Sequence, residues 1–260
     1  MAHPKSKSEE SPLRNYKIVL EYDGTPYCGW QVQAKGVSIQ GKIQEALRKL
    51  TKEKISVIAS GRTDAGTHAL GQVAHFKSRT TRPISRFQYA LNAMLAPTIA
   101  VKTMEEIAPD FHAQRDAKTK LYAYLILNHT VPSVFLDRFS WQVPRPLNWD
   151  AIHAALEVLV GEHDFKSFQS VGTDLKSTVR KIHWIKIEES FKDHPHLYAI
   201  QIEANGFLKQ MVRNIVGTLV QVGQNRLHPK DVKKILESKD RRKAGPAAPA
   251  RGLFLLRVNY

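Results

Sequence analysis

The sequence predicts an α+β fold made of two ferredoxin-like or RRM-like β-α-β-β-α-β units with predominantly antiparallel sheets. Segments in which apolar and polar residues alternate, as in half-buried strands, recur along the chain, and apolar stripes of helical spacing separate them. The order of elements in the first half is repeated in the second. With 42% hydrophobic and 24% charged side chains among 260 residues, the composition is that of a globular protein with a large core.

The first unit is predicted over residues 15–110, after a polar tail, residues 1–14, that is expected to be disordered. The alternation of its first strand is carried by Tyr16, Ile18, Leu20 and Tyr22. Ser38 can cap the first helix, and Pro83 suits the first position of the second helix. The six elements are predicted over residues 15–22, 38–50, 54–60, 72–77, 83–94 and 99–106.

The second unit is predicted over residues 111–260 and repeats this order, with one extra helix near its end. Asn148 can cap its first helix and Gly161 can end it. A long helix follows two strands and carries an apolar stripe, and Pro229 can open the extra helix. The elements are predicted over residues 118–128, 148–161, 180–188, 197–204, 208–222, 229–238 and 253–259.

The charge of the chain indicates its class of partner. Lys and Arg number 39 against 24 Asp and Glu, a net charge of +15, and a strongly basic domain is typical of nucleic-acid-binding proteins. The single cysteine, Cys28, excludes a disulfide framework and a Cys-rich metal site. No apolar run reaches the ~18 residues of a membrane span, and the first residues lack the apolar segment of a secretory signal. We expect a cytoplasmic protein with no membrane partner.

The segment SGRTDAGTH, residues 60–68, holds the strongest candidate for a reactive group. Its two glycines permit tight turns and a close approach of the backbone to a ligand on either side of Arg62 and Asp64. A carboxylate held on such a loop can act as an ionised nucleophile. A surface loop in which Thr63 and Asp64 cap backbone N–H groups is the more common occurrence of this composition, so the segment alone does not decide between the two.

Other chemistries lack their sequence motifs. A two-metal nuclease needs several convergent carboxylates, whereas the nearest acidic residue after Asp64 is Glu105. The zinc deaminase signature and the glycine-rich motifs that bind nucleotide phosphates are absent from the sequence. The sequence therefore offers no local motif for a metal or cofactor site, while carboxylates distant in sequence can still converge through folding.

Two further positions, Arg213 and Tyr122, could take part in a site with Asp64. Arg213 lies among apolar residues of the predicted long helix, where an arginine usually extends to solvent or pairs with a buried acid. If that acid is Asp64, the pair would keep the carboxylate ionised and oriented. Tyr122 lies on a predicted strand, either packed as strand tyrosines usually are or stacked on an extruded base.

Eight segments carry a family pattern in a fixed order along the chain. They are YDGTPYCGWQ (22–31), SIQGKIQEAL (38–47), SGRTDAGTHALGQVAHF (60–76), ALNAML (90–95), FHAQRDAKTKLYAY (111–124), GEHDFKSF (161–168), NGFLKQMVRNIVGTLVQVG (205–223) and AGPAAPARGLFLLRV (244–258). The GRTDAG sequence is highly specific. With these segments the chain resembles the bacterial tRNA pseudouridine synthases of the TruA family, which act on the anticodon arm.

The resemblance implies the roles of individual residues. Asp64 matches the family's essential aspartate, which attacks either the ribose anomeric carbon or the uracil ring, or stabilises a glycal-like intermediate. Tyr122 matches the tyrosine that stacks on the target ring and assists proton transfer. Arg62 matches the arginine that holds the target nucleotide out of the helix, and Arg213 matches the arginine that pairs with the aspartate. The other substrate-binding positions so implied are Thr63, Phe207, Met211 and Leu253.

The resemblance also implies the activity and the assembly. The protein is expected to isomerise uridines 38–40 in the anticodon stem-loop of tRNA to pseudouridine, as a homodimer and without metal, ATP or redox cofactor. A non-catalytic tRNA-binding protein or chaperone on the same scaffold is the alternative. Thr67 stands where the family usually has valine, and Arg115 lies one position later than the family's commoner arginine. The first change keeps a β-branched shape, and the second makes an RNA contact at that position doubtful.

Overall fold

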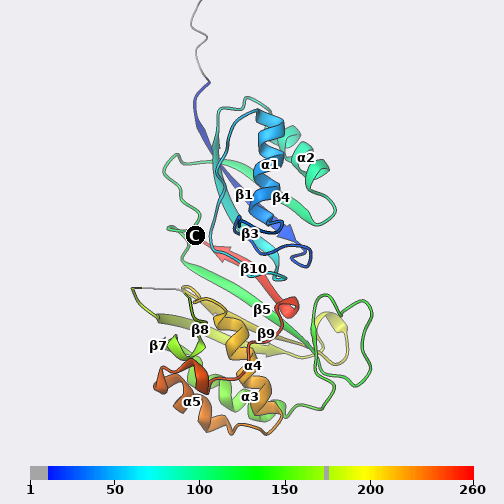
Figure 1. The fold of residues 1–260 in the computed structure, drawn as a ribbon, viewed down its shortest axis with the longest axis vertical. Helices are drawn as coiled ribbons and strands as arrows, with labels where there is room; N and C mark the ends of the chain where they lie inside the picture. The colour runs from blue at the N-terminus through cyan, green and yellow to red at the C-terminus, as the bar shows by residue number, and fades with distance from the viewer. Residues whose placement is uncertain (1–10, 173–175) are drawn as a thin grey trace, which may run out of the picture.

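A ten-stranded, mostly antiparallel sheet runs through the computed structural model, which describes residues 11–172 and 176–260 (Figure 1). The strands are β1 (Arg14–Tyr22), β2 (Ile58–Ala59), β3 (His68–Ser78), β4 (Ile99–Ile107), β5 (Thr119–Leu127), β6 (Trp141–Gln142), β7 (Gly161–Asp164), β8 (Val179–Glu188), β9 (Leu197–Ala204) and β10 (Leu253–Asn259). They follow the order β4-β1-β3-β10-β5-β9-β8-β7, with β2 beside β3 and β6 beside β5. The predicted α+β class with a predominantly antiparallel sheet is confirmed.

Helices pack on the sheet towards both ends of the molecule. They are α1 (Ile39–Thr51), α2 (Ile84–Leu95), α3 (Trp149–Leu156), α4 (Met211–Gly223) and α5 (Pro229–Ser238). Figure 1 shows α1 and α2 in the upper part of the view and α3, α4 and α5 in the lower part. One continuous cluster of buried apolar side chains, which includes Ile43 of α1 and Ile215 of α4, joins the helices to the sheet.

The first two helices begin where polar and proline signals place them. The hydroxyl of Ser38 accepts a hydrogen bond from the backbone N–H of Gly41 (3.1 Å), which satisfies a donor that has no partner within the first turn of α1. Ile43 and Leu47 then lie on the buried face. Pro83 precedes α2 as its cap and is not the first helical residue, a shift of one position from the prediction.

The C-terminal strand joins the two halves of the sheet. β10 pairs in parallel with β3, where Phe254 lies opposite His68, and antiparallel with β5, where Leu255 lies opposite Tyr122. Each half places its last strand beside its first, β4 next to β1 and β10 next to β5. The division into two units near residue 110 remains a prediction, because the sheet and the core continue across it.

The strand predicted over residues 54–60 is wrong for most of its length, since only the two residues of β2 pair with β3. Two glutamines of α1 take the place of a strand neighbour. Gln44 Oε1 accepts a hydrogen bond from the Val57 backbone N–H (3.2 Å), and Gln40 Nε2 donates to the Val57 carbonyl (2.9 Å). Because buried backbone groups need partners, these side chains satisfy both backbone groups of Val57 without strand pairing.

Two helices are shorter than predicted. Gln210 has a positive φ of 59°, which interrupts the helix, so α4 begins at Met211 and Leu208 lies buried in the turn before it. α3 ends at Leu156, and a 3-10 turn continues to Leu159. The predicted bounds of α5 and β10 are confirmed.

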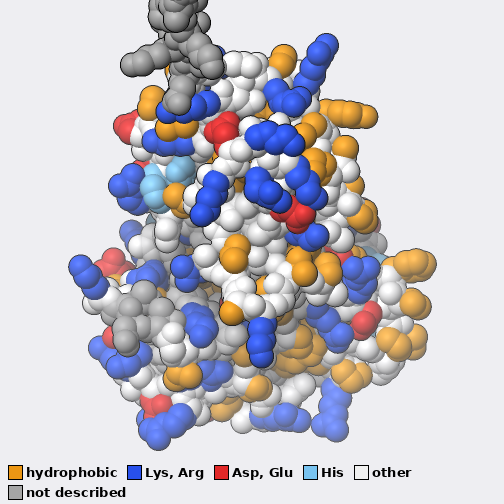
Figure 2. All heavy atoms as spheres, turned by 45° about the horizontal axis from the view of Figure 1, so that its top comes forward, with side chains coloured by type: hydrophobic (Ala, Val, Ile, Leu, Met, Phe, Trp, Pro, Cys, Tyr) orange, Lys and Arg blue, Asp and Glu red, His pale blue; other side chains and the backbone are white. Residues whose placement is uncertain are grey.

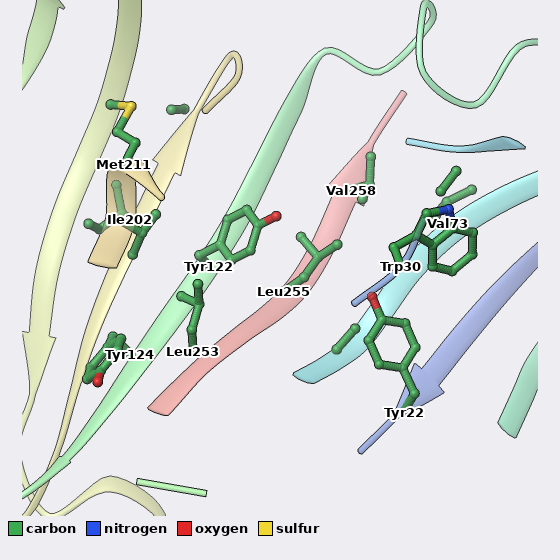
Figure 3. Close-up of a cluster of buried hydrophobic side chains, with 14 of the residues drawn as sticks. Tyr22, Trp30, Val73, Tyr122, Tyr124, Ile202, Met211, Leu253, Leu255 and Val258 are labelled. Carbon is green, nitrogen blue, oxygen red and sulfur yellow. The ribbon is translucent and has the colours of Figure 1, made fainter. Parts of the chain in front are cut away.

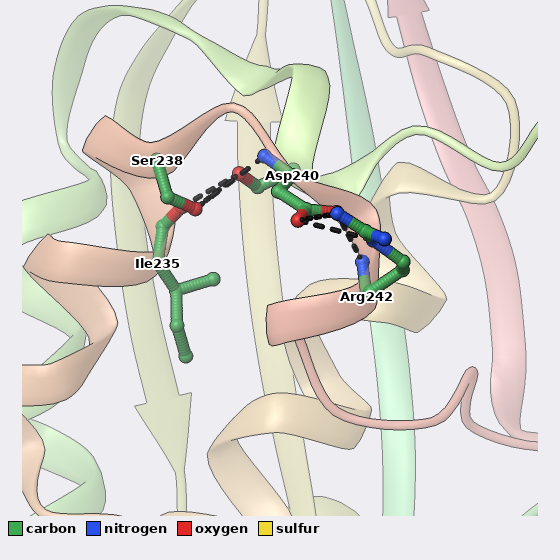
Figure 4. A network of polar contacts seen from close by, with 5 residues as sticks. Ile235, Ser238, Asp240 and Arg242 are labelled. Carbon is green, nitrogen blue, oxygen red and sulfur yellow. Dashed lines mark hydrogen bonds and ion pairs between the residues drawn. The ribbon is translucent and has the colours of Figure 1, made fainter.

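Polar contacts hold the turn through which the chain leaves α5 (Figure 4). The Ser238 hydroxyl donates to the Ile235 carbonyl (2.8 Å) and accepts from the Asp240 backbone N–H (3.4 Å). The Asp240 carboxylate accepts from the backbone N–H and the guanidinium of Arg242 at 2.7 to 3.1 Å. The turn directs the chain to residues 244–250, which return across α4.

The segment before β1 was predicted to be disordered, and most of it, residues 1–10, lies outside the described residues. The part that is described leads into β1, which starts at Arg14, one position earlier than expected. Among the described helices, none combines the length and the apolar character needed to cross a bilayer.

Candidate active site

The loop between β2 and β3 carries Asp64, and backbone contacts fix it on both sides. The backbone N–H of Trp30 donates to the Thr63 carbonyl (3.0 Å), and that of Thr67 donates to the Asp64 carbonyl (3.1 Å). Gly29 lies against this loop with a φ of 107°, and a Cβ there would stand 2.9 Å from the Thr63 carbonyl oxygen. Glycine is therefore needed where the two backbones meet.

A buried polar network lies under the same loop. The Tyr22 hydroxyl is 2.9 Å from the Thr63 hydroxyl, and Gln72 Nε2 donates to Tyr22 (3.4 Å) and to the Gly61 carbonyl (2.9 Å). The Ser60 hydroxyl donates to Gln72 Oε1 (2.8 Å). Burial raises the pKa of Tyr22 to about 12, so the phenol stays neutral and keeps its proton for hydrogen bonding. The network holds the loop in one conformation.

The Asp64 carboxylate pairs with Arg213, which lies 149 positions further along the chain. Arg213 Nη1 donates to Asp64 Oδ2 at 3.1 Å, and Arg213 Nε donates to the Ala248 carbonyl at 2.7 Å. The Arg213 side chain is 14% exposed and that of Asp64 30%, so the arginine lies behind the carboxylate. The bond to Ala248 holds the planar guanidinium in place, and the bond from Nη1 then orients the Asp64 carboxylate.

The Ala248 carbonyl, which accepts the hydrogen bond from Arg213, belongs to a segment, residues 245–248, that packs closely on α4. A Cβ on Gly217 would stand 1.7 Å from the Pro246 carbonyl oxygen, so the segment lies directly on the helix backbone. The backbone N–H of Gly245 donates to the Thr218 hydroxyl (2.9 Å), and that of Ala248 donates to the Arg213 carbonyl (3.0 Å).

Asp64 faces an open cavity of about 1000 Å³ between the two halves of the chain. The first half contributes residues 60–67 of the Asp64 loop and the turn near Trp30, and the second half contributes β5 and residues 207–212. Figure 3 shows Tyr22 on β1 and Tyr122 on β5, with β3 and β10 between them. The cavity has both polar and apolar walls, as ligand-binding cavities commonly do.

Tyr122 forms part of the cavity wall beside Asp64. Its ring meets that of Phe207 edge to face at a centroid distance of 4.9 Å. Burial raises the pKa of Tyr122, with smaller contributions from Tyr22 and Asp64, so this phenol is neutral. Its hydroxyl forms no hydrogen bond with any residue that the structure describes.

The structure brings the site residues expected from the sequence to one place. Seven line the cavity, namely Arg62, Thr63, Asp64, Tyr122, Phe207, Met211 and Leu253, and Arg213 lies behind Asp64. Arg62 is exposed on the loop, whereas Met211 and Leu253 are buried. Sequence reasoning missed Tyr22 and Gln72 as supports of the loop. The only sequence signal for Gln72 is a polar residue inside a strand whose neighbours are apolar.

Thr67 ends the loop with a buried hydroxyl that has no hydrogen-bond partner in the described part of the chain; the residue is 1% exposed. We expect Thr67→Val to raise the free energy of unfolding by about 1 kcal/mol, since a methyl group replaces an unsatisfied polar group. Denaturant unfolding measures this, with Thr218→Val as the control. The Thr218 hydroxyl is equally buried but makes two hydrogen bonds, so that variant should lose stability. Equal losses in both variants would contradict the prediction.

Among the described residues, no three His, Cys, Asp or Glu side chains come together to form a ligand set for a metal ion. Asp64 has an arginine beside it instead of further carboxylates. The basic composition and this acid–arginine pair in an open cavity are the features expected of one class of protein, the enzymes that act on nucleic acids.

Comparisons with known proteins identify the family. The family model described as tRNA pseudouridine synthase matches residues 18–115 and 155–260. A protein named tRNA pseudouridine synthase A from Moorella thermoacetica is 46% identical over 246 residues, 94% of this chain and 98% of its own length. The protein of that name from Brevibacillus brevis is 43% identical over 95% of this chain and 100% of its own length. The chain belongs to the tRNA pseudouridine synthase family.

Solved structures give a weaker likeness. A chain in the crystal structure of a Cbf5-Nop10-Gar1 complex aligns with 79% of this chain and 45% of its own length, at 14% identity and a TM-score of 0.36. This likeness is too low to support an argument about function.

Proposed function

We propose that the chain converts uridines 38–40 in the anticodon stem-loop of tRNA to pseudouridine, as a cytoplasmic homodimer that uses Asp64 and no cofactor. Family membership supports the isomerisation of uridine in tRNA. The target positions, the homodimer and the cytoplasmic location rest on the resemblance of the GRTDAG loop and the other family segments.

The reaction is an isomerisation, so atoms and electrons balance without an added reagent. The bond between uracil N1 and ribose C1′ breaks and a bond between C5 and C1′ forms. The proton on C5 leaves and N1 ends with a proton. Asp64 provides the carboxylate that attacks C1′ or the uracil ring, or that stabilises a glycal-like intermediate, and Tyr122 lies in the same cavity wall to stack on the ring.

The surrounding residues support this chemistry in different ways. Arg213 orients the Asp64 carboxylate, and Thr63 connects the loop to the buried network. Arg62, exposed at the cavity rim, suits the role of filling the space that an extruded nucleotide leaves. Exclusion of water strengthens electrostatic interactions around the carboxylate, and the apolar side chains that provide it are Phe207, Met211 and Leu253.

The observation that carries the proposal is the ion pair between Asp64 and Arg213 at the cavity. A protein that only bound tRNA would gain nothing from a carboxylate there, because it repels phosphate. The basic surface supports an RNA partner, since Figure 2 shows Lys and Arg outnumbering Asp and Glu on the face in view.

The target positions can be tested with tRNAs that carry a single uridine at position 38, 39 or 40. We expect pseudouridine at that position in each tRNA, read by carbodiimide adducts and primer extension, and none at these positions in a control tRNA with cytidine at all three. Modification confined to other uridines would contradict the assignment.

Sedimentation equilibrium tests the homodimer, for which we expect twice the chain mass of 29.4 kDa.

A further inference from the structure

Two cations, Lys120 and Arg180, line the same cavity as Tyr122. Lys120 precedes Tyr122 by two residues on β5, so both side chains leave the same face of the strand, about 7 Å apart. Arg180 lies on β8 and acts electrostatically on Lys120. Both Lys120 and Arg180 are half-buried and line the cavity that holds Asp64.

Neither cation has an ion-pair partner in the described part of the chain. Lys120 Nζ donates to the Ser60 carbonyl (2.7 Å), and Arg180 Nη1 donates to the carbonyls of Ser177 (3.2 Å) and Val179 (2.6 Å). Burial, with a smaller effect of Arg180, lowers the pKa of Lys120 to about 8. Half-buried like charges without a counter-ion are unfavourable, so an anion that binds between them is stabilised.

We propose that Lys120 and Arg180 form a subsite for one RNA phosphate, the phosphodiester next to the uridine that is turned into the cavity. The inference rests on the proposed function and adds a contact to it. A phosphate is the anion that an RNA substrate brings into a cavity of this kind, and it would supply a negative charge that the described residues do not place beside either side chain. Lys120 leaves the same strand face as Tyr122, so with the uracil against Tyr122 the adjoining backbone would pass near Lys120.

The subsite also connects substrate binding to the loop of Asp64. Lys120 Nζ contacts the Ser60 carbonyl, and a Cβ on Gly61 would stand 3.0 Å from the same nitrogen. A phosphate bound to Lys120 therefore lies beside the start of the segment that positions Asp64. Arg62, the next residue on this loop, faces the same cavity.

A thermodynamic cycle tests the subsite. The affinity for tRNA is measured with a single neutral methylphosphonate 5′ or 3′ of uridine 39, for the wild type, Lys120→Gln and Arg180→Gln. We expect one of the two neutral linkages to weaken wild-type binding about tenfold, as loss of a charged hydrogen bond does. Each variant should bind the unmodified tRNA more weakly than the wild type by a similar factor. Combining that linkage with Lys120→Gln should weaken binding no further, because both remove the same contact.

The controls separate phosphate binding from support of the loop. Lys181→Gln removes an equal charge from the neighbouring, exposed position on β8 and should leave the effect of the linkage intact. Lys120→Arg keeps the positive charge, so the neutral linkage should again weaken the binding of tRNA to this variant. The subsite is wrong if the neutral linkage and Lys120→Gln together weaken binding by the product of their separate factors. It is also wrong if neither neutral linkage weakens binding by the wild type. Wild-type turnover of ordinary tRNA, followed alongside, tests the proposed function separately.

The pH profile gives a second readout. The groups that face Lys120 are Arg180 on β8 and the Ser60 carbonyl on the loop, and no described carboxylate is among them. We expect kcat/KM of the wild type to fall above about pH 8 as free Lys120 loses its proton, and Lys120→Arg to abolish this fall. The same fall in both proteins would contradict a cation-dependent contact.

Discussion

Asp64→Asn is expected to abolish pseudouridine formation while leaving the affinity for tRNA equal or higher. The amide keeps the size of the side chain and can still accept a hydrogen bond from Arg213, but it cannot act as the nucleophile. We expect a loss of about 10⁴-fold or more in the rate of a single turnover, with enzyme in excess. Affinity is kept because the lost charge is negative and faces a polyanion.

The matched control for this variant is Asp110→Asn, the same change at an exposed position between β4 and β5. It should keep full activity. Filter binding and single-turnover rates are measured on the same preparations, so that unfolding is separated from loss of chemistry. A rate within tenfold of the wild type would remove Asp64 from the role of nucleophile.

Arg213 is expected to show the second largest effect. Arg213→Gln removes the donor to Asp64, and Arg213→Lys leaves one ammonium group in place of two separate donors to Asp64 and Ala248. A carboxylate misplaced by about 1 Å can lower a rate about 10²-fold, so we expect kcat to fall by that order in Arg213→Gln and by less in Arg213→Lys. KM for tRNA should change little, since the arginine is mostly buried.

Arg226→Lys provides the control, because Arg226 is exposed beyond the end of α4. Steady-state kinetics separate kcat from KM, and thermal unfolding reports the stability of each variant. Should Arg213→Gln raise KM for tRNA while kcat is unchanged, Arg213 would be a substrate contact and not a positioning residue for Asp64.

Local signals in the sequence predicted elements well where one residue type decides a boundary. Ser38 begins α1 by capping it, and Pro229 begins α5, whose bounds were predicted to the residue. The strand predicted over residues 54–60 is wrong for most of its length, and at Val57 Gln40 and Gln44 of α1 take the place of a strand neighbour. Such contacts depend on how elements pack and leave no periodic pattern in the sequence.

The candidate site divides in the same way. Residue type singled out Asp64 and Arg213, but their pairing required the resemblance to a family or the folded chain, which brings residues 149 positions apart together. The neighbouring cations Lys120 and Arg180 are not adjacent in sequence, and Ala204 of β9 separates their strands. Only the sheet order places them in one cavity wall, so sequence spacing could not reveal them.

Release of tritium from uracil C5 of unmodified tRNA tests the central claim most directly, because C5 loses its hydrogen only when the new carbon–carbon bond forms. Wild type and Asp64→Asn are compared in the presence of EDTA. We expect release by the wild type, unchanged by EDTA, and none by Asp64→Asn. Tight binding of tRNA without release by the wild type, although uridine occupies positions 38–40, would contradict the isomerase and leave a tRNA-binding protein.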